Sequence, residues 1–295
     1  MYLGFDIGGS SIKAVLLKDR EIVRSKIEDL PGNLDELFKK FKAMSGELAV
    51  GKVVEAVGLG LPGAMDQKRE AMLKSPNIPY LDGQPLKKLI QAKFGETPVF
   101  INHDAFCFLL AEKTIGQAKD LKSAVLLTIG SGIGCAWMVG GEIITGANGS
   151  ASEGGHMIVD IEKSLDLEEV ASNKLFKNKL AITSAQAQEK LAQGDDRARE
   201  IFDLMGRNLG VGIANIINFF DPQAVIINGG IAAARETITE KMKESIDNFV
   251  VSPAARSTPI IFSELGRFGG AIGAALLAES LIKSALISSS AGVKN

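Results

Sequence analysis

The feature that most constrains the fold is the stretch from residue 124 to 156, in which short apolar runs alternate with glycine turns. Val125 to Ile129 lead directly into Gly130-Ser131-Gly132-Ile133-Gly134, and a second apolar run, Cys135 to Val139, follows. This order predicts two strands joined by a tight glycine turn. Because glycine has no Cβ, successive N–H groups in such a turn can approach an anion closely, which suits a phosphate. The stretch ends with Glu153-Gly154-Gly155-His156, a carboxylate close to an imidazole.

A second hairpin of the same composition begins the chain. Tyr2 to Ile7 predict a strand that enters Gly8-Gly9-Ser10-Ser11, and Ile12 to Leu17 predict the returning strand. Two such hairpins, roughly 120 residues apart, suggest two related halves. The glycines are required for the turn itself, but Asp6 and Lys13 beside the serines form a set suited to a hydrated magnesium ion and phosphate oxygens.

The remaining pattern alternates helices with short buried strands. Helical spacing covers 34–44, 105–114, 184–220 and 232–249, and a helix of small residues begins at 269. Apolar runs predict strands at 53–60, 98–101, 224–227 and 260–261. The strand at 224–227 enters Asn228-Gly229-Gly230, a turn that presents N–H groups to an anion. Residues 288–295 are expected to form a frayed tail.

Two positions allow both a structural and a functional interpretation. Asp104 follows a predicted strand and begins a predicted helix, so it is suited equally to capping the helix and to acting as a general base. Asn77 lies between two prolines in a loop, where it either completes a turn or contacts a ligand.

Composition excludes several function classes. The net charge of −2, with cations scattered among acids, gives no footprint for nucleic acid. Two cysteines in apolar surroundings, Cys107 and Cys135, favour a reducing, cytoplasmic location. We find no secretory signal and no apolar run near the ~18 residues of a membrane span, and therefore expect no membrane partner.

Eight motifs in series resemble the ROK family of sugar kinases and sugar-responsive regulators. They are DIGGSSIK (6–13), GLPG (60–63), SPN (75–77), the segment 104–112, LTIGSGIG (127–134), SEGGH (152–156), DPQAVIINGG (221–230) and GAIGAALLAE (270–279). The resemblance implies an α/β protein with two ribonuclease H-like domains of the actin and hexokinase type around an interdomain cleft. We expect the small domain at 1–116 plus a C-terminal helix at about 280–295, and the large domain at 117–279.

The resemblance also implies roles for individual residues. Asp104 matches the family's catalytic base. The residues implied to bind the sugar are Gly63, Asn77, His103, Asp104, Glu153, His156 and Glu168. Those implied to bind ATP are Asp6, Gly8, Gly9, Ser10, Ser11 and Lys13 in the first phosphate loop, Gly130, Ser131, Gly132 and Gly134 in the second, and Gly229 with Gly230 at the adenosine. Asp6 is implied to hold Mg²⁺ through water.

Two departures from the family pattern alter these expectations. His103 stands where the family commonly has Asn, so one sugar contact changes, with Asn102 as an alternative and a structural role for His103 still open. No cysteine occurs between Met157 and Leu167, where many members have a zinc motif, so we expect no zinc site.

The expected activity is ATP-dependent phosphorylation of a hexose, either glucose or an N-acetylhexosamine, by a homodimer. Two alternatives remain: a sugar sensor without catalysis, and a kinase that uses polyphosphate as donor. Because Asp6, Asp104 and the phosphate loops are retained, we favour the enzyme over the sensor.

Overall fold

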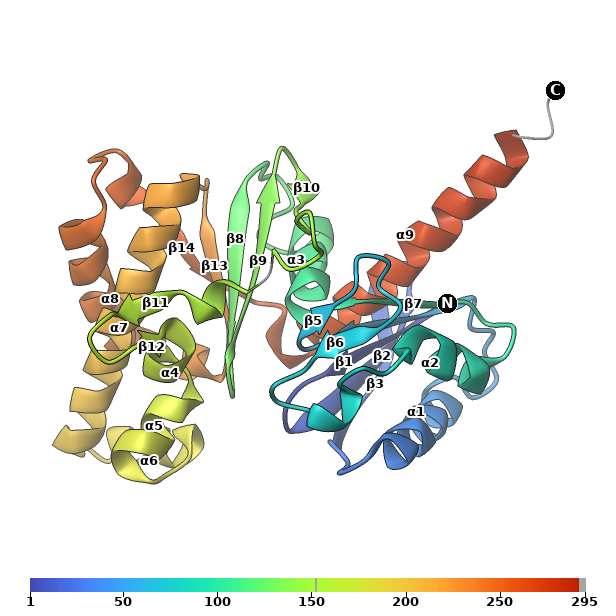
Figure 1. Ribbon diagram of the computed structural model, residues 1–295, viewed down its shortest axis with the longest axis horizontal. Helices are drawn as coiled ribbons and strands as arrows, with labels where there is room; N and C mark the ends of the chain where they lie inside the picture. The colour runs from blue at the N-terminus through green and yellow to red at the C-terminus, as the bar shows by residue number, and fades with distance from the viewer. Residues whose placement is uncertain (152, 292–295) are drawn as a thin grey trace. The chain divides into compact units, whose positions relative to one another are not determined.

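The computed structural model describes residues 1–151 and 153–291, which form two compact units (Figure 1). Unit 1 comprises residues 1–119, 145–151 and 265–295, and unit 2 comprises residues 120–144 and 152–264. Each unit has its own mixed five-stranded sheet with helices packed on it.

The sheet of unit 1 has the order β3-β2-β1-β4-β7. Its strands are β1 (Tyr2–Ile7), β2 (Ser11–Lys18), β3 (Glu21–Asp29), β4 (Ala56–Leu61) and β7 (Val99–His103). Strands β1, β2 and β3 pair antiparallel, whereas β1, β4 and β7 pair parallel. The carboxyl ends of β1, β4 and β7 therefore share one edge, where α/β sheets place ligands.

Helices cover both faces of this sheet. Leu3, Phe5 and Ile7 of β1 pack in one cluster with apolar residues of α1 (Leu34–Leu48) and α2 (Leu86–Phe94). On the other face lie α9 (Gly269–Ala291) and α3 (Asp104–Ile115), which also contact each other. The smaller elements are the hairpin β5 (Ala64–Met65) with β6 (Met72–Lys74) and the 3₁₀ turns η1 (Pro79–Leu81) and η5 (Gly266–Phe268).

Glycines allow α9 to pack directly on the strands. A Cβ added to Gly58 of β4 would overlap the carbonyl group of Ala274, and one added to Gly4 of β1 would overlap the carbonyl oxygen of Ala271. The helix also approaches α3 closely, because a Cβ on Gly273 would overlap the carbonyl of Cys107. Helix α9 therefore needs small residues, because its backbone packs directly against β1, β4 and α3.

The sheet of unit 2 repeats the topology, with the order β10-β9-β8-β13-β14. Its strands are β8 (Ala124–Ile129), β9 (Ile133–Val139), β10 (Glu142–Ile143), β13 (Val225–Gly229) and β14 (Ile260–Phe262). Strands β8, β9 and β10 again pair antiparallel, and β8, β13 and β14 pair parallel. The expectation of two related halves agrees with this shared strand order.

Apolar residues of β8 and β9 pack with several helices in the core of unit 2. The helices are α4 (Leu167–Ala171), α5 (Asn173–Leu180), α6 (Ser184–Ala192), α7 (Asp196–Phe220) and α8 (Arg235–Phe249). A small sheet of β11 (Ile158–Asp160) and β12 (Leu165–Asp166) precedes α4, and the 3₁₀ turns are η2 (Gly154–His156), η3 (Gly230–Ala234) and η4 (Ala255–Ser257).

Most predicted strands and helices are present, with differences at their ends. The helical region 184–220 is interrupted between α6 and α7, where Gly194 has a φ of 81°. The helix expected from residue 232 begins at Arg235, after η3, and β4 begins at Ala56 and not at residue 53. Strand β3 was not predicted, because seven of its nine residues are exposed and its sequence lacks a buried run.

The C-terminal region differs from expectation in two ways. Helix α9 continues to Ala291, where a frayed tail was expected from residue 288, and residues 292–295 lie outside the described part of the chain. Residues 265–279 group with unit 1, whereas we expected 117–279 in the large domain. The backbone contacts of α9 with β1 and β4 account for this difference.

The segment Gly266–Ile287 is long and apolar enough to cross a membrane, which the sequence analysis did not anticipate. Half of its most apolar window is buried inside the protein. Core helices commonly have this composition, and the contacts of Ala271 and Ala274 with the sheet explain it here.

We predict that Gly58→Ala destabilises unit 1, because the added methyl group meets the Ala274 backbone and has no room to move. Overpacking of this kind costs about 1–3 kcal/mol, which would lower the midpoint of urea denaturation. The matched control is Gly46→Ala on the exposed side of α1, where an added Cβ meets nothing within 4 Å. An equal effect of the two substitutions would contradict the packing argument.

Candidate functional site

In unit 1, Asp6 and Lys13 face each other across the first hairpin. They are directly paired in the register of β1 and β2, and Lys13 Nζ donates to Asp6 Oδ2 over 3.0 Å. Asp6 is buried, and a Cβ added to Gly270 of α9 would lie 2.7 Å from its Cγ. Burial raises the pKa of Asp6 above its ordinary value, the Lys13 ammonium opposes this rise, and the negative charge of Asp104 adds to it.

The turn of this hairpin contains the residues predicted for the first phosphate loop. Gly8 N–H donates to the Ser11 carbonyl over 2.9 Å, which closes the turn. Gly9 and Ser10 at its tip are exposed, whereas Gly8 and Ser11 are half-buried. The predicted residues are therefore adjacent and partly accessible.

Asp104 is the first residue of α3, immediately after β7. The N-cap of this helix is His103, whose Nδ1 faces the Ala105 N–H at 3.3 Å, and the Asp104 carboxylate also accepts from this N–H at 2.6 Å. His103 is buried, and its Nδ1 lies 3.1 Å from Asp104 Oδ1. The expected capping role thus belongs formally to His103, with Asp104 contributing from the first turn.

Unit 1 places Asp6 and Asp104 at the same edge of its sheet. Asp6 is paired with Gly60, and Gly60 is paired with Asn102, two residues before Asp104. Neighbouring strands lie about 4.8 Å apart, so the backbones of Asp6 and Asn102, which are two strands apart, are separated by roughly 10 Å. Burial raises the pKa of the Cys107 thiol, and the charges of Asp6 and Asp104 add to this rise.

Gly63 and Asn77, which the resemblance assigns to the sugar, also lie in unit 1. Gly63 has a φ of 115°, and its Cα faces the backbone of Lys74 and Ser75, so glycine is required there by the local chain path. Asn77 is exposed. The structure thus gives Gly63 a packing role, and the sugar contacts of both residues remain predictions.

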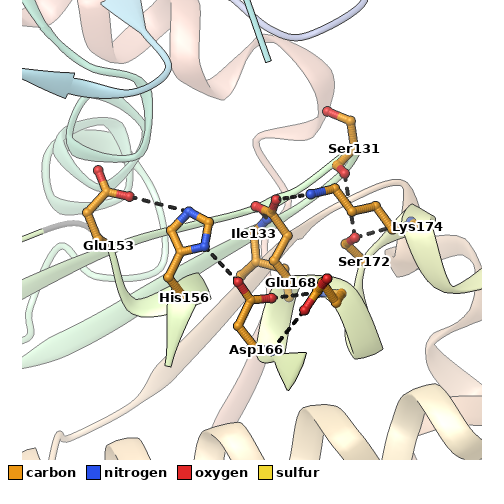
Figure 2. Close-up of polar contacts among 9 residues, drawn as sticks. Ser131, Ile133, Glu153, His156, Asp166, Glu168, Ser172 and Lys174 are labelled. Atoms are coloured by element: carbon orange, nitrogen blue, oxygen red, sulfur yellow. Dashed lines mark hydrogen bonds and ion pairs between the residues drawn. The ribbon is translucent and has the colours of Figure 1, made fainter. Parts of the chain in front are cut away.

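In unit 2, Glu168 anchors the second glycine turn. Its Oε2 accepts from Ile133 N–H at 2.8 Å, and its Oε1 lies 2.5 Å from Lys174 Nζ. Glu168 is buried beside Ile133 and Lys174 (Figure 2). A Cβ added to Gly132 would overlap its carboxylate. The predicted phosphate turn and the predicted sugar-binding glutamate are therefore in direct contact.

The same turn is held to the start of α5. Asn173 N–H donates to the Gly130 carbonyl over 3.0 Å, and Ser172 Oγ lies 3.5 Å from the Ser131 carbonyl oxygen. Ser131 is exposed at the tip, and Gly134, at the start of β9, pairs with Thr128. These bonds fix the path of the turn from both sides.

Glu153 and His156 lie at the two ends of η2, near α4 (Figure 2). His156 Nε2 is 3.9 Å from Glu153 Oε2, and its Nδ1 is 2.8 Å from Asp166 Oδ2. The hydrogen bond to Asp166 is the main cause that raises the pKa of His156 above its ordinary value. The glycine pair between them is required, since a Cβ on Gly155 would overlap the Ile133 carbonyl oxygen.

Gly229 and Gly230 join β13 to η3. Gly229 has a φ of 114°, and a Cβ there would overlap the Ile129 carbonyl oxygen of the neighbouring strand. Gly230 is exposed, and its carbonyl accepts from Gln188 Nε2 at 3.1 Å. Both glycine turns of unit 2 thus begin at the carboxyl ends of adjacent parallel strands.

The residues of unit 1 fit a magnesium ion that is shared with phosphate. Among residues 1–151 and 153–291, no three or more His, Cys, Asp or Glu side chains gather into a group that could hold a metal. Mg²⁺ usually keeps several waters and binds one or two carboxylates together with substrate phosphates. A single carboxylate such as Asp6, beside the exposed glycine turn, meets that requirement.

Asp166 and Lys174 contact the predicted site residues but were not predicted from the sequence. Asp166 is the N-cap of α4 in a capping box with Glu169, and the pattern Asp-x-x-Glu before an apolar run could have indicated it. Its contact with His156 could not be foreseen, because it depends on how η2 packs beside α4.

Comparison with known proteins identifies the family. Residues 2–280 match the ROK family. The chain belongs to the ROK family. The N-acetyl-D-glucosamine kinase of Vibrio atlanticus is 31% identical, over 94% of this chain and 99% of the relative. The glucokinase of Thermotoga maritima is 27% identical, over 95% and 98%.

A solved structure of this ROK family is also similar. The ROK family glucokinase from Streptomyces griseus, in complex with glucose and AMPPNP, superposes with a TM-score of 0.86 at 26% identity, covering 95% of this chain and 99% of that one. The predicted fold class, two α/β domains of the actin and hexokinase type, is thereby confirmed.

We predict that Gly132→Ala destabilises the ROK chain, because the new methyl group would displace the Glu168 carboxylate from Ile133 N–H. A cost of about 1–3 kcal/mol is expected and would appear as a lower melting temperature. The control is Gly130→Ala in the same turn, where an added Cβ meets nothing within 4 Å. A melting temperature unchanged by Gly132→Ala would refute the anchoring role.

We also predict that His156 stabilises the fold more in acid than in base. Its raised folded pKa means that this contribution is complete below the unfolded pKa of about 6.5 and is lost as the pH rises through the folded value. The loss of melting temperature caused by His156→Gln should be larger at about pH 5.5 than at about pH 9. A pH-independent difference would show that the Asp166 contact does not favour the charged ring.

Proposed function

We propose that this ROK protein is an ATP-dependent sugar kinase that phosphorylates a hexose, with Asp104 as the general base. The observation that supports this most directly is that Asp6 and Asp104 lie at the same edge of the unit 1 sheet, near the carboxyl ends of β1 and β7. Phosphoryl transfer requires a base near the attacking hydroxyl and a cation site near the phosphates, and little other chemistry from the protein. Two carboxylates in different surroundings suit these two tasks.

The exposure and the contacts of Asp104 support its proposed role as the base. Its side chain is 25% exposed, so a hydroxyl group can approach it, while one oxygen accepts the Ala105 N–H. This bond and the nearby His103 ring restrict the rotation of the carboxylate. A fixed carboxylate is suited to remove the proton as the sugar oxygen attacks.

Asp6, Lys13 and the glycine turns are proposed to bind the nucleotide. MgATP would supply the transferable phosphoryl group and neutralise its charge. Asp6 would hold the hydrated Mg²⁺, and the Lys13 ammonium at 3.0 Å would attract phosphate oxygens. Gly229 and Gly230 are proposed to let the adenosine lie against the backbone.

Glu153, His156 and Glu168 are proposed to bind sugar hydroxyls. Each carboxylate oxygen accepts more than one hydrogen bond, so Glu168 can receive a hydroxyl in addition to Ile133 N–H and Lys174. The glucokinase and N-acetyl-D-glucosamine kinase relatives favour glucose or an N-acetylhexosamine as the substrate.

A coupled assay of ADP release tests this function. The protein is incubated with MgATP and each of glucose, mannose, fructose, allose, N-acetylglucosamine and N-acetylmannosamine. We expect turnover with at least one of these sugars. If ATP fails with every sugar and polyphosphate succeeds, the donor assignment is wrong. If both donors fail while calorimetry still detects sugar binding, the protein is a sensor and the kinase proposal is refuted.

We predict that Asp104→Asn lowers kcat by about 10²–10⁴-fold and leaves the sugar Kd nearly unchanged, because a base removes a proton only during the reaction. The control is Asp120→Asn, which removes an exposed carboxylate. Near wild-type turnover in Asp104→Asn would exclude Asp104 as the base.

A further inference from the structure

The carboxylate of Asp166 has a separate partner on each oxygen. Oδ1 accepts the backbone N–H of Glu169 at 2.9 Å and so caps α4, whereas Oδ2 lies 2.8 Å from His156 Nδ1 (Figure 2). The backbone N–H of Asp166 is bonded in turn to Glu169 Oε2 at 3.2 Å. The position of the carboxylate is therefore fixed by the helix that also contains Glu168.

We propose that Asp166 is a positioning residue that holds His156 by its Nδ1–H and directs Nε2 towards Glu153 and a bound ligand. This role deepens the proposed function, on which its ligand part rests. No contact of Asp166 with the sugar is required, because it acts through the imidazole.

The geometry fixes which ring nitrogen has the proton when His156 is neutral. A carboxylate oxygen only accepts hydrogen bonds, so at 2.8 Å it requires a hydrogen on Nδ1. The Nε2 atom is then an acceptor in the neutral ring and a donor in the charged ring. At 3.9 Å from Glu153 Oε2, Nε2 makes no hydrogen bond to that carboxylate and remains available to a hydroxyl group.

The other carboxylates near His156 act in the same direction as Asp166. Glu153 and Glu168 add to the effect of Asp166 in raising the pKa of His156, while partial burial opposes them. Lys174 pairs with Glu168 at 2.5 Å and reduces the effect of that carboxylate. Asp166, through its hydrogen bond, is the largest of these influences.

Asp166→Asn separates the two tasks of this carboxylate. Asn is a good N-cap, and its amide oxygen can keep the Glu169 N–H bond, which places the NH₂ group where Oδ2 was. An NH₂ group only donates, so Nδ1 must become the acceptor and the neutral ring must move its proton to Nε2. The substitution is therefore expected to invert the tautomer without unfolding α4.

Nitrogen-15 NMR of the histidine rings tests this directly in the free protein, without sugar or nucleotide. The chain has two histidines, and the spectrum of His156→Gln identifies the His156 signals by their loss. We expect the Nδ1–H tautomer in the wild type and the Nε2–H tautomer, with a lower pKa, in Asp166→Asn. An Nε2–H tautomer in the wild type, or the same tautomer in both proteins, would overturn the proposal.

Sugar affinity tests the consequence for the ligand. Asp166→Asn should weaken the sugar Kd, measured by calorimetry, by about tenfold, which corresponds to one lost hydrogen bond. The matched control, Glu169→Gln, keeps an acceptor for the Asp166 N–H and should change neither tautomer nor Kd. An inverted tautomer with an unchanged sugar Kd would overturn the positioning role, whereas loss of kinase activity alone would bear only on the proposed function.

Discussion

The candidate site residues of both units depend on glycines, whose lack of a Cβ lets the backbone pack directly against neighbouring groups. Gly60 allows the first turn of α3 to approach β4, since a Cβ there would lie 3.2 Å from Asp104 Cα. Gly132 leaves room for the Glu168 carboxylate, and Gly155 lets η2 lie on β9. In each case a missing side chain positions an acidic or basic residue next to a strand end. A side chain at one of these glycines would therefore displace the site residues directly, because they or their neighbours are the groups that it meets.

Asp6 and Asp104 of unit 1 have the same carboxyl group but differ in burial and in their partners. Asp6 is 9% exposed and has a raised pKa, with Lys13 favouring its charged form. Asp104 is more exposed and is held by a backbone N–H and the His103 ring. A carboxylate paired with a cation is suited to organise charge, and an accessible one is suited to accept a proton.

The elements that the sequence predicted well are those with a local signal. The hairpins around Gly8 and Gly130 could be predicted because apolar runs end in glycine, and α3 could be predicted from its continuous apolar stretch. Strand β3 could not, since its residues pair with β2 while remaining mostly exposed. The contacts of Asp166 and Lys174 were missed because each joins segments that only tertiary packing brings together.

The two sheets share one strand order, but their hairpins differ at the positions that flank the turn. In unit 1 the positions flanking the turn are Asp6 and Lys13, whereas Thr128 and Gly134 are paired at the equivalent place in unit 2. The second hairpin therefore has no charged pair at this position. Its turn is anchored instead by a glutamate from a helix inserted between β10 and β13. One strand order thus carries two different kinds of turn: the first has a charged pair within its own hairpin, and the second is held by a carboxylate from outside the hairpin.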